Sequence, residues 1–512
     1  TFIFSAFICA CGGQDLQVSI TTENVELDLL EYKFLKTEIT PTPDTETEII
    51  WASSDEEVVS VTSTGKIQGL KLGTATITAT VGDATDTCSV TVSLPADASP
   101  QILLKSGIYQ NATLKVGDSV DIVSLITYKD KEYDDASWVY SCSNTSVAEI
   151  IDGKIIAKTA GQTEITAKPT WKGIENDNFK QTVTVNVKNF DKQTSLLFSE
   201  TDYVNTYGRT YVEQNALVLD HSGTAIEFEF YGTQLAISTK LVQGEAVAVR
   251  IFIDGDNQGI FTKITNTSFQ NITLAENLSN TAHKARIVKA SPQDIGVFSI
   301  RNIYAESFAK TTAKSNLLIE FVGDSITVGY SILDNGQGSQ NVNNTDVTKT
   351  YAYTIAKNLN ADFSFVCTQG IAVNTTPYLG TSMIQLYKWY SANNKVGYTH
   401  PKSPDVVVIN LGTNDGTYLA NNPSHNLSTD FYMLLNLIRG KHDDAYIILT
   451  YGMMSVNSTV LSAINSAIDD FDDEKVSFVT PASPSGEGGH PNQAVNDKTA
   501  EILTEYIKNL LA

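Results

Sequence analysis

The chain has 512 residues, too many for one compact domain, so about three or four domains are expected. Its formal net charge is −23, from 35 Lys and Arg against 58 Asp and Glu, which excludes a general binder of nucleic acid or of anionic membranes. Apolar residues make up 42% and charged residues only 18% of the chain. This composition is typical of a folded, β-rich protein made for the outside of the cell.

Residues 1–13 are predicted to be the remains of a secretory signal, because Thr1–Ala10 are almost all apolar or small. Ile8-Cys9-Ala10-Cys11 resembles the lipobox of bacterial lipoproteins. The resemblance implies a surface lipoprotein of the bacterial cell envelope, held to the membrane only by a lipid on Cys11. A frayed apolar terminus is the alternative. The five cysteines are too few and too scattered for a disulfide framework or a zinc site, so no metal is expected.

A repeat with a period of roughly 88 residues follows. Its shared segments are Trp51, Gly65–Ile67 and Gly73–Ala79 in the first copy and Trp138, Gly153–Ile155 and Gly161–Ala167 in the second. Short alternating runs separated by Gly, Asp or Asn predict one β-sandwich over 14–96 and another over 100–188. The copies resemble bacterial Ig-like domains of group 2, although Thr163 stands where that pattern has Ala. Their partner, a cell surface or a glycan, is left open.

The next segment, 190–310, also alternates apolar and polar residues but does not repeat the pattern again. Ala225–Phe230 and Ala246–Ile253 read as strands, and Asp254-Gly255 is typical of a hairpin turn. This predicts a third β domain.

From residue 315 to the end the pattern changes to strands that alternate with helices, which predicts an α/β layered domain with a parallel sheet over 315–512. The apolar runs expected to form the sheet are Leu317–Val322, Phe363–Val366, Asp405–Asn410 and Tyr446–Leu449. The segments expected to be helical are Tyr351–Asn360, Ser428–Arg439, Asn457–Phe471 and a last helix that carries Ile502–Leu511.

Polar motifs follow the first three apolar runs, where parallel strands place functional groups. Ser325 follows the first run, Gly370 the second and Asn414 the third. A serine at a strand-to-helix turn is either an exposed nucleophile or a helix N-cap. Gly370 and Asn414 are either donors to an oxyanion or ordinary turn residues.

His490 lies in a Gly-rich loop before the last helix, with Glu487 three residues upstream. That carboxylate can hold one side of the imidazole while the other ring nitrogen faces a serine. A solvated loop carboxylate is the alternative for Glu487. His400, His425 and His442 have no acidic or Gly-rich setting in the sequence, and no role is predicted for them.

Together Gly323-Asp324-Ser325, Gly370, Gly412–Asp415 and His490 resemble, in order and spacing, the SGNH (GDSL-like) hydrolases. The resemblance implies that Ser325 is the nucleophile and His490 the general base. It also implies an oxyanion hole made by the N–H groups of Ser325 and Gly370 and the amide of Asn414, with no cofactor. The family commonly has Asp where this chain has Glu487, so a triad and a Ser–His dyad both stay open.

The resemblance extends upstream, where Tyr207–Thr210, Leu217–Gly223 and His283–Lys289 are similar to the jelly roll that precedes the hydrolase in carbohydrate esterase family two. It implies a jelly roll over 190–310 and a substrate such as acetylated xylan or glucomannan, deacetylated through an acetyl-Ser325 intermediate. The alternatives are a lipid or peptidoglycan esterase on the same fold, and a glycan-binding adhesin whose hydrolase domain is inactive.

Overall fold

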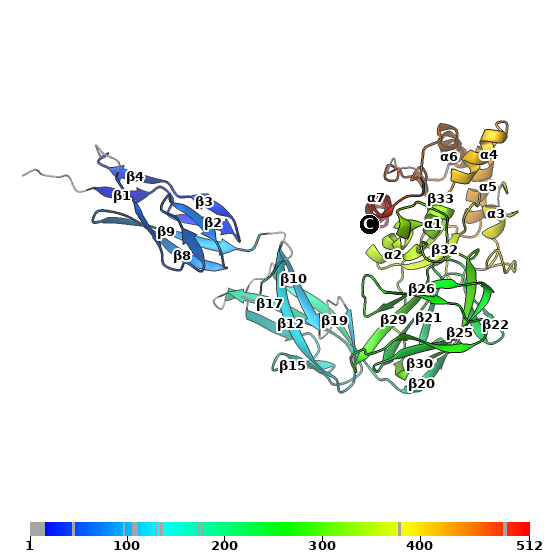
Figure 1. The fold of residues 1–512 in the computed structure, drawn as a ribbon, viewed down its shortest axis with the longest axis horizontal. Helices are drawn as coiled ribbons and strands as arrows, with labels where there is room; N and C mark the ends of the chain where they lie inside the picture. The colour runs from blue at the N-terminus through cyan, green and yellow to red at the C-terminus, as the bar shows by residue number, and fades with distance from the viewer. Residues whose placement is uncertain are drawn as a thin grey trace, which may run out of the picture. The chain divides into compact units, whose positions relative to one another are not determined.

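The computed structural model describes residues 16–512 apart from 43–46, 96–97, 105–110, 129–130, 134–136, 172–173, 176–178, 377–379 and 485–488. The lipobox with Cys11 and the carboxylate of Glu487 therefore lie outside the described residues. The chain forms two compact units, one made mainly of the residues before Lys188 and one made mainly of Lys188–Ala512 (Figure 1). Among the described residues, no helix is both long and apolar enough to cross a bilayer.

The first β-sandwich of the N-terminal unit is built on strict alternation. In β8 every second residue from Ala75 to Val81 is buried, and β8 pairs with β9 and β5. The strands are β1 (Gln17–Ile20), β2 (Asn24–Asp28), β3 (Tyr32–Phe34), β4 (Thr37–Thr40), β5 (Ile50–Ser53), β6 (Val59–Val61), β7 (Lys66–Gly69), β8 (Gly73–Val81) and β9 (Ala84–Ser93). They form the sheets β2-β9-β8-β5 and β3-β7-β6 and the pair β1-β4.

The second sandwich repeats this architecture and explains the departure at Thr163. The Thr163 side chain is buried, and its hydroxyl accepts a hydrogen bond from the backbone N–H of Asn144 at 2.9 Å, so a polar group is tolerated where the repeat has Ala. The strands are β10 (Ser99–Leu104), β11 (Asn111–Lys115), β12 (Ser119–Tyr128), β13 (Lys131–Tyr133), β14 (Ser137–Cys142), β15 (Ala148–Ile151), β16 (Lys154–Ala157), β17 (Gly161–Trp171), β18 (Ile174–Glu175) and β19 (Gln181–Lys188).

The predicted third β domain opens the second unit as a set of 11 hydrogen-bonded strands around an apolar core. The Ile253 carbonyl accepts from the Asp256 N–H at 3.0 Å, with positive φ at Asp254 and Gly255, which is the expected hairpin turn. The strands are β20 (Lys192–Leu197), β21 (Val204–Tyr207), β22 (Tyr211–Glu213), β23 (Ala216–Leu219), β24 (Ala225–Tyr231), β25 (Leu235–Gly244), β26 (Val247–Ile253), β27 (Ile260–Ile264), β28 (Gln270–Ala275), β29 (Ala282–Lys289) and β30 (Gly296–Ala309).

The C-terminal domain has a parallel sheet in the order β32-β31-β33-β34-β35, which confirms the predicted fold class. Its strands are β31 (Leu318–Gly323), β32 (Asp362–Cys367), β33 (Val406–Asn410), β34 (Tyr446–Thr450) and β35 (Val476–Phe478). The chain order reverses on the two sides of β31, and such a switch point opens a crevice at the carboxyl ends of the strands. The three-residue β35 was not predicted, since its apolar run is too short to stand out.

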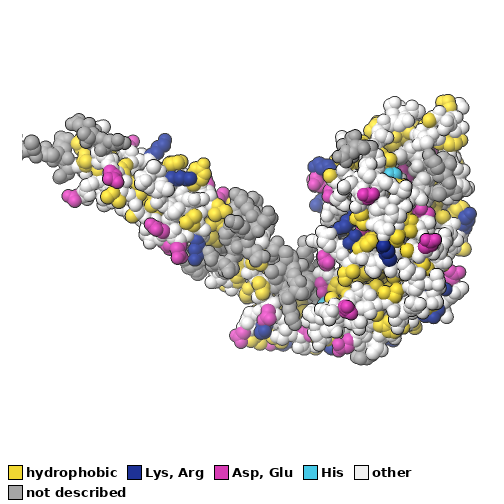
Figure 2. Space-filling model, in the orientation of Figure 1, with side chains coloured by type: hydrophobic (Ala, Val, Ile, Leu, Met, Phe, Trp, Pro, Cys, Tyr) yellow, Lys and Arg dark blue, Asp and Glu magenta, His cyan; other side chains and the backbone are white. Residues whose placement is uncertain are grey.

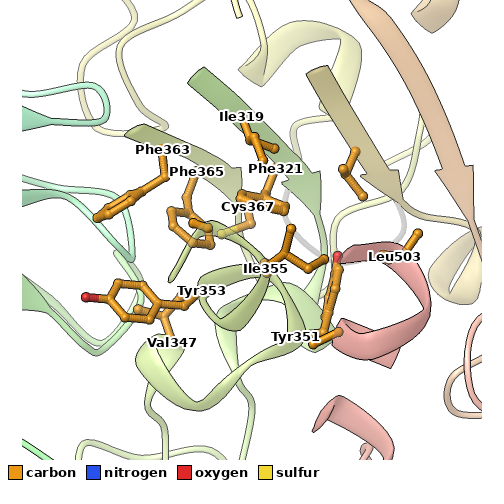
Figure 3. Close-up of a cluster of buried hydrophobic side chains, with 14 of the residues drawn as sticks. Ile319, Phe321, Val347, Tyr351, Tyr353, Ile355, Phe363, Phe365, Cys367 and Leu503 are labelled. Atoms are coloured by element: carbon orange, nitrogen blue, oxygen red, sulfur yellow. The ribbon is translucent and has the colours of Figure 1, made fainter. Parts of the chain in front are cut away.

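Helices cover both faces of this sheet (Figure 1). They are α1 (Ser325–Val328), η2 (Ile332–Asp334), η3 (Val347–Lys349), α2 (Tyr351–Asn358), α3 (Met383–Leu386), α4 (Thr413–Asn421), α5 (Leu427–Arg439), α6 (Ser458–Phe471) and α7 (Gln493–Leu511). Side chains of α2 and α7 pack on one face, as Figure 3 shows for Tyr351, Ile355 and Leu503 against Phe321 and Phe365. Side chains of α3, α5 and α6 pack on the other. The polar helix α4 and the short α3 were not predicted.

The jelly roll and the C-terminal domain share one buried interface. Tyr207 stacks on Phe363 with ring centroids 5.0 Å apart, and the buried guanidinium of Arg250 pairs with Asp346, with its Nε 2.7 Å from the carboxylate. On the face seen in Figure 2, acidic and basic side chains are interspersed over this unit. Because the interface contains both core aromatics and a buried ion pair, the two domains support each other.

Candidate active site

Ser325 lies at the first position of α1, immediately after β31, and its side chain is 6% exposed. The N-cap is Asp324, whose carboxylate accepts a hydrogen bond from the Ile326 N–H at 2.9 Å. Asp324, and not Ser325, therefore caps the helix. The structure thus excludes the N-cap role for Ser325, and its hydroxyl is left available for another partner.

That partner is His490, whose Nε2 lies 2.8 Å from Ser325 Oγ although the two residues are 165 positions apart. Burial of the half-buried imidazole lowers its pKa to about 4. At neutral pH the ring is consequently uncharged and can accept a proton. The structure thus brings the predicted nucleophile and base into hydrogen-bond contact.

The two predicted oxyanion donors lie at the ends of the neighbouring strands. Gly370 follows β32 with a φ of +68°, a conformation that favours glycine. Asn414 lies in the first turn of α4, and its amide donates to the Ile371 carbonyl at 2.9 Å and to Asp324 Oδ2 at 3.4 Å. Asn414 therefore joins the Gly370 turn to the nucleophile turn, and all three predicted donors belong to one group.

Two buried carboxyl groups adjoin these residues in the chain: Asp324 precedes Ser325, and Asp415 follows Asn414. Burial raises the pKa of Asp324 to about 7, with a further contribution from Asp415, and burial likewise raises the pKa of Asp415 to about 7. At neutral pH the two carboxyls consequently carry less negative charge than ordinary aspartates would.

A second polar cluster lies at the amino-terminal side of the same sheet, and it corrects the sequence interpretation of two histidines. His400 Nε2 lies 3.0 Å from the buried carboxylate of Glu320, and the His442 ring meets the His400 ring edge to face at 4.3 Å. His425 likewise contacts Asp430, at 2.5 Å. No role was predicted for these histidines, yet His400 pairs with a carboxylate 80 positions away and His425 with one only five positions along the chain. The local sequence contains the second of these carboxylates and not the first.

Glu320, His400 and His442 are also the one group of potential metal ligands in the part of the chain that the structure describes. However, Arg209 Nη2 lies 3.3 Å from Glu320 Oε2 and 3.4 Å from His400 Nε2. Burial works to raise the pKa of Glu320, but Arg209 and His400 outweigh it and hold that pKa well below its usual range. The guanidinium thus already supplies the positive charge that a metal ion would supply, and this cluster reads as a buried ion pair.

Three family models match the chain. Residues 16–92 match the bacterial Ig-like domain (group 2), residues 206–314 the carbohydrate esterase 2 N-terminal domain, and residues 321–509 the GDSL-like lipase/acylhydrolase family. The last two matches place a jelly roll directly before a hydrolase domain that holds Ser325 and His490. The chain thus carries a carbohydrate esterase 2 N-terminal domain followed directly by a GDSL-like hydrolase domain. The resemblance expected from the sequence motifs is confirmed.

Two curated proteins are similar to part of this chain. The cellulase/esterase CelE of Acetivibrio thermocellus is 29% identical over 308 residues, which are 57% of this chain and 37% of the relative. The acetylxylan esterase / glucomannan deacetylase of Cellvibrio japonicus is 28% identical over 225 residues, which are 41% of this chain and 60% of the relative. The chain thus spans less than two thirds of the length of either relative.

Solved structures align with this chain over almost their own whole length. A family two carbohydrate esterase from Clostridium thermocellum, solved in complex with cellohexaose, is 25% identical, with a TM-score of 0.55, and the match covers 60% of this chain and 99% of that one. An acetyl xylan esterase from Butyrivibrio proteoclasticus shares the fold at 21% identity, with a TM-score of 0.57 and coverage of 63% and 99%.

Proposed function

We propose that this chain is a serine-dependent carbohydrate esterase that removes O-acetyl groups from a polysaccharide. The observation that carries the proposal is the 2.8 Å contact between Ser325 Oγ and a neutral His490 Nε2 at the strand ends. Gly370 and Asn414 lie at the same edge of the sheet, where they can serve the oxyanion.

In the first half of the reaction His490 Nε2 takes the Ser325 proton while Ser325 Oγ attacks the acetyl carbonyl. The negative charge moves to the carbonyl oxygen, which accepts from the N–H groups of Ser325 and Gly370. It also accepts from the Asn414 N–H that makes the longer, 3.4 Å contact to Asp324 in the resting site and that turns to the oxyanion. When the tetrahedral intermediate collapses, the ester C–O bond breaks and His490 returns the proton to the leaving sugar oxygen. The products are a free sugar hydroxyl and acetyl-Ser325.

In the second half a water molecule replaces the sugar. His490 accepts one proton from this water as its oxygen attacks the acetyl-Ser325 carbonyl. Collapse breaks the bond to Ser325 Oγ, which regains the proton from His490, and acetic acid leaves and ionises to acetate in solution. Every proton transferred within the site passes through His490 Nε2, so a dyad accounts for the balance whether or not Glu487 assists.

The substrate class is proposed from the relatives. One curated relative is named an acetylxylan esterase / glucomannan deacetylase, and one solved relative holds cellohexaose. We infer that this chain acts on O-acetyl groups of a plant-type polysaccharide such as xylan or glucomannan. The formal charge of −23 fits a neutral substrate of this kind better than an anionic one.

The test is acetate release from a panel of acetylated xylan, acetylated glucomannan, acetylated peptidoglycan and esters of increasing acyl length. The proposal predicts release from the acetylated plant glycans and none from the Ser325→Ala protein. A preference for long acyl chains or for peptidoglycan would instead support the other esterase assignments. Glycan binding without hydrolysis would support an adhesin.

We also propose that the protein works outside the cytoplasm, attached to the envelope through a lipid on Cys11. The lipobox-like sequence Ile8–Cys11 supports this proposal. Metabolic labelling with a fatty acid should mark the wild-type protein and not a Cys11→Ser variant. The Ig-like pair would then contact the cell surface or a glycan.

A further inference from the structure

The loop that carries His490 is attached to the segment that directly follows the nucleophile, residues 329–338, here termed the post-nucleophile segment. Helix α1 ends at Val328, and the Tyr330 N–H then donates to the Ser325 carbonyl at 3.0 Å. This bond brings the start of the post-nucleophile segment beside Ser325. The side chain of Tyr330 consequently lies next to the imidazole of His490, the proposed general base.

The Tyr330 ring lies flat on the imidazole of His490. Their ring centroids are 4.0 Å apart and their planes differ by 14°, so the two rings are stacked face to face. The imidazole Nε2 is also hydrogen-bonded to Ser325 Oγ. The hydrogen bond fixes one edge of the ring, and the stack fixes its plane.

The backbone of His490 is held by the same segment. Its N–H donates to the Gly336 carbonyl at 3.0 Å, and Gly336 has a φ of +77°. A Cβ atom on Gly336 would collide with the His490 carbonyl oxygen, so only glycine permits this approach. Two contacts to one segment, one through the backbone and one through the ring, therefore set where the base points.

Behind the base, the start of α7 is anchored to α2. The buried Asn496 amide donates to the Pro491 carbonyl at 3.2 Å and accepts from the Tyr351 N–H at 3.0 Å. The Tyr351 hydroxyl lies 2.9 Å from Thr327 Oγ1, two residues after the nucleophile. These hydrogen bonds fix the position of the backbone next to His490. They do not fix the rotation of the imidazole about its side-chain bonds, which the contact with Tyr330 restricts.

We propose that Tyr330 is the positioning residue for the general base: its ring holds the imidazole plane so that Nε2 aims at Ser325 Oγ. The inference rests on the proposed function, since it assigns a task within the same site. The stack also has an electrostatic consequence. When His490 takes the Ser325 proton, the imidazolium lies on the electron-rich face of the phenol, a cation–π contact that the neutral ring does not make. The contact is stronger in the transition state than before it, so it accelerates the step.

The test compares Tyr330→Leu, which removes the ring, with Tyr330→Phe, which keeps the ring and removes the hydroxyl. Tyr446→Leu is the matched control, since Tyr446 is half-buried at the amino-terminal end of β34, away from the carboxyl ends that form the site. We expect Tyr330→Leu to lower kcat on a small acetyl ester by about a hundredfold. Its KM should stay within about twofold of the wild-type value, and Tyr330→Phe should restore most of kcat. Tyr446→Leu should leave kcat unchanged.

The same set of variants separates this inference from the proposed function. If Ser325→Ala abolishes turnover but Tyr330→Leu keeps full kcat, the positioning role is wrong and the esterase assignment stands. Equal losses in the Leu and Phe variants would also overturn it, because the hydroxyl rather than the stacked ring would then matter. A change confined to KM would make Tyr330 a substrate contact instead. Full turnover by Ser325→Ala would remove the proposed function itself.

Discussion

Among the described residues of the C-terminal domain, two serine–histidine contacts have equal length, and one of them has the setting of a catalytic centre. Ser325 Oγ lies 2.8 Å from His490 Nε2, and Ser403 Oγ lies 2.8 Å from His442 Nδ1. Both histidines have a pKa lowered to about 4, in each case mainly by burial. Neither distance nor basicity therefore distinguishes the two pairs.

Position on the sheet does distinguish them. Ser325 follows the carboxyl end of β31, beside the turns of Gly370 and Asn414, whereas Ser403 and His442 precede β33 and β34. At the amino-terminal side His442 packs on His400 and the Glu320–Arg209 ion pair, which serve the domain interface. The comparison teaches that a serine and a histidine become a candidate site through the donors around them, and these gather at the carboxyl ends of parallel strands.

The largest expected effect separates the two serines directly. Ser325→Ala should lower kcat by at least about a thousandfold, since it removes the nucleophile. Ser403→Ala should leave kcat unchanged, because the exposed Ser403 serves only as a partner of His442. Acetate release measured at saturating substrate checks both variants. Equal activity of wild type and Ser325→Ala would reverse the assignment.

The next effect tests the proposed oxyanion donors, which are found beside the Ser325–His490 pair and not beside Ser403–His442. Asn414→Ala should lower kcat by about a hundredfold or more, as expected for loss of one oxyanion donor. Asn422→Ala, at the other end of α4, is the control and should leave kcat unchanged. An Asn414→Ala enzyme with wild-type kcat would show that Asn414 serves only the turn at Ile371.

Changes in the Arg209–Glu320–His400 cluster should lower the stability of the protein rather than its turnover. Glu320→Gln leaves the buried Arg209 charge without its carboxylate, which should cost about 3–5 kcal/mol of unfolding free energy. Denaturant unfolding measures this loss, with the exposed Lys498–Glu501 pair as control through Glu501→Gln, which should not shift the midpoint. If kcat of the folded Glu320→Gln protein collapsed while its stability held, the cluster would belong to the active site after all.

The smallest effect concerns pH. Because burial lowers the His490 pKa to about 4, the base remains unprotonated down to mildly acid pH. As pH falls from neutral, Asp324 and Asp415 become protonated, which removes negative charge beside the site and should not lower kcat/KM. The kcat/KM of the esterase reaction should decline only as pH approaches about 4. A decline centred near the ordinary histidine pKa of about 6.5 would show that His490 is more exposed or more strongly paired than its burial indicates.

The sequence predicts the site residues better than it predicts the residues that pair with or pack against the groups around them. Ser325, Gly370 and Asn414 stand at strand ends that hydrophobic patterning locates, so the sheet itself brings them together. The partner of Glu320 could not be predicted, since Arg209 lies 111 positions away in another domain. A carboxylate inside the apolar run Leu317–Val322 was nonetheless a usable signal, because a buried charge must be paired.

Tyr330 carries no such signal. Nothing in its sequence setting indicates that its ring stacks on a histidine from the opposite end of the domain, because this contact depends on how the loop after α1 folds back. Likewise, the hydrogen bond that makes Thr163 acceptable in the second sandwich depends on the Asn144 N–H from a different strand connection. Contacts between loops are decided by tertiary structure, which patterning along the chain does not encode.

In the proposed mechanism Ser325 becomes acetylated during turnover, and trapping this intermediate is the most direct test. The enzyme is mixed with excess acetyl ester, quenched in acid within the first turnovers and digested for mass spectrometry. The account predicts one acetyl group on the peptide that contains Ser325, and none in the Ser325→Ala protein. An acetyl group on the peptide that contains Ser403, or rapid turnover with no acetylated peptide, would contradict it.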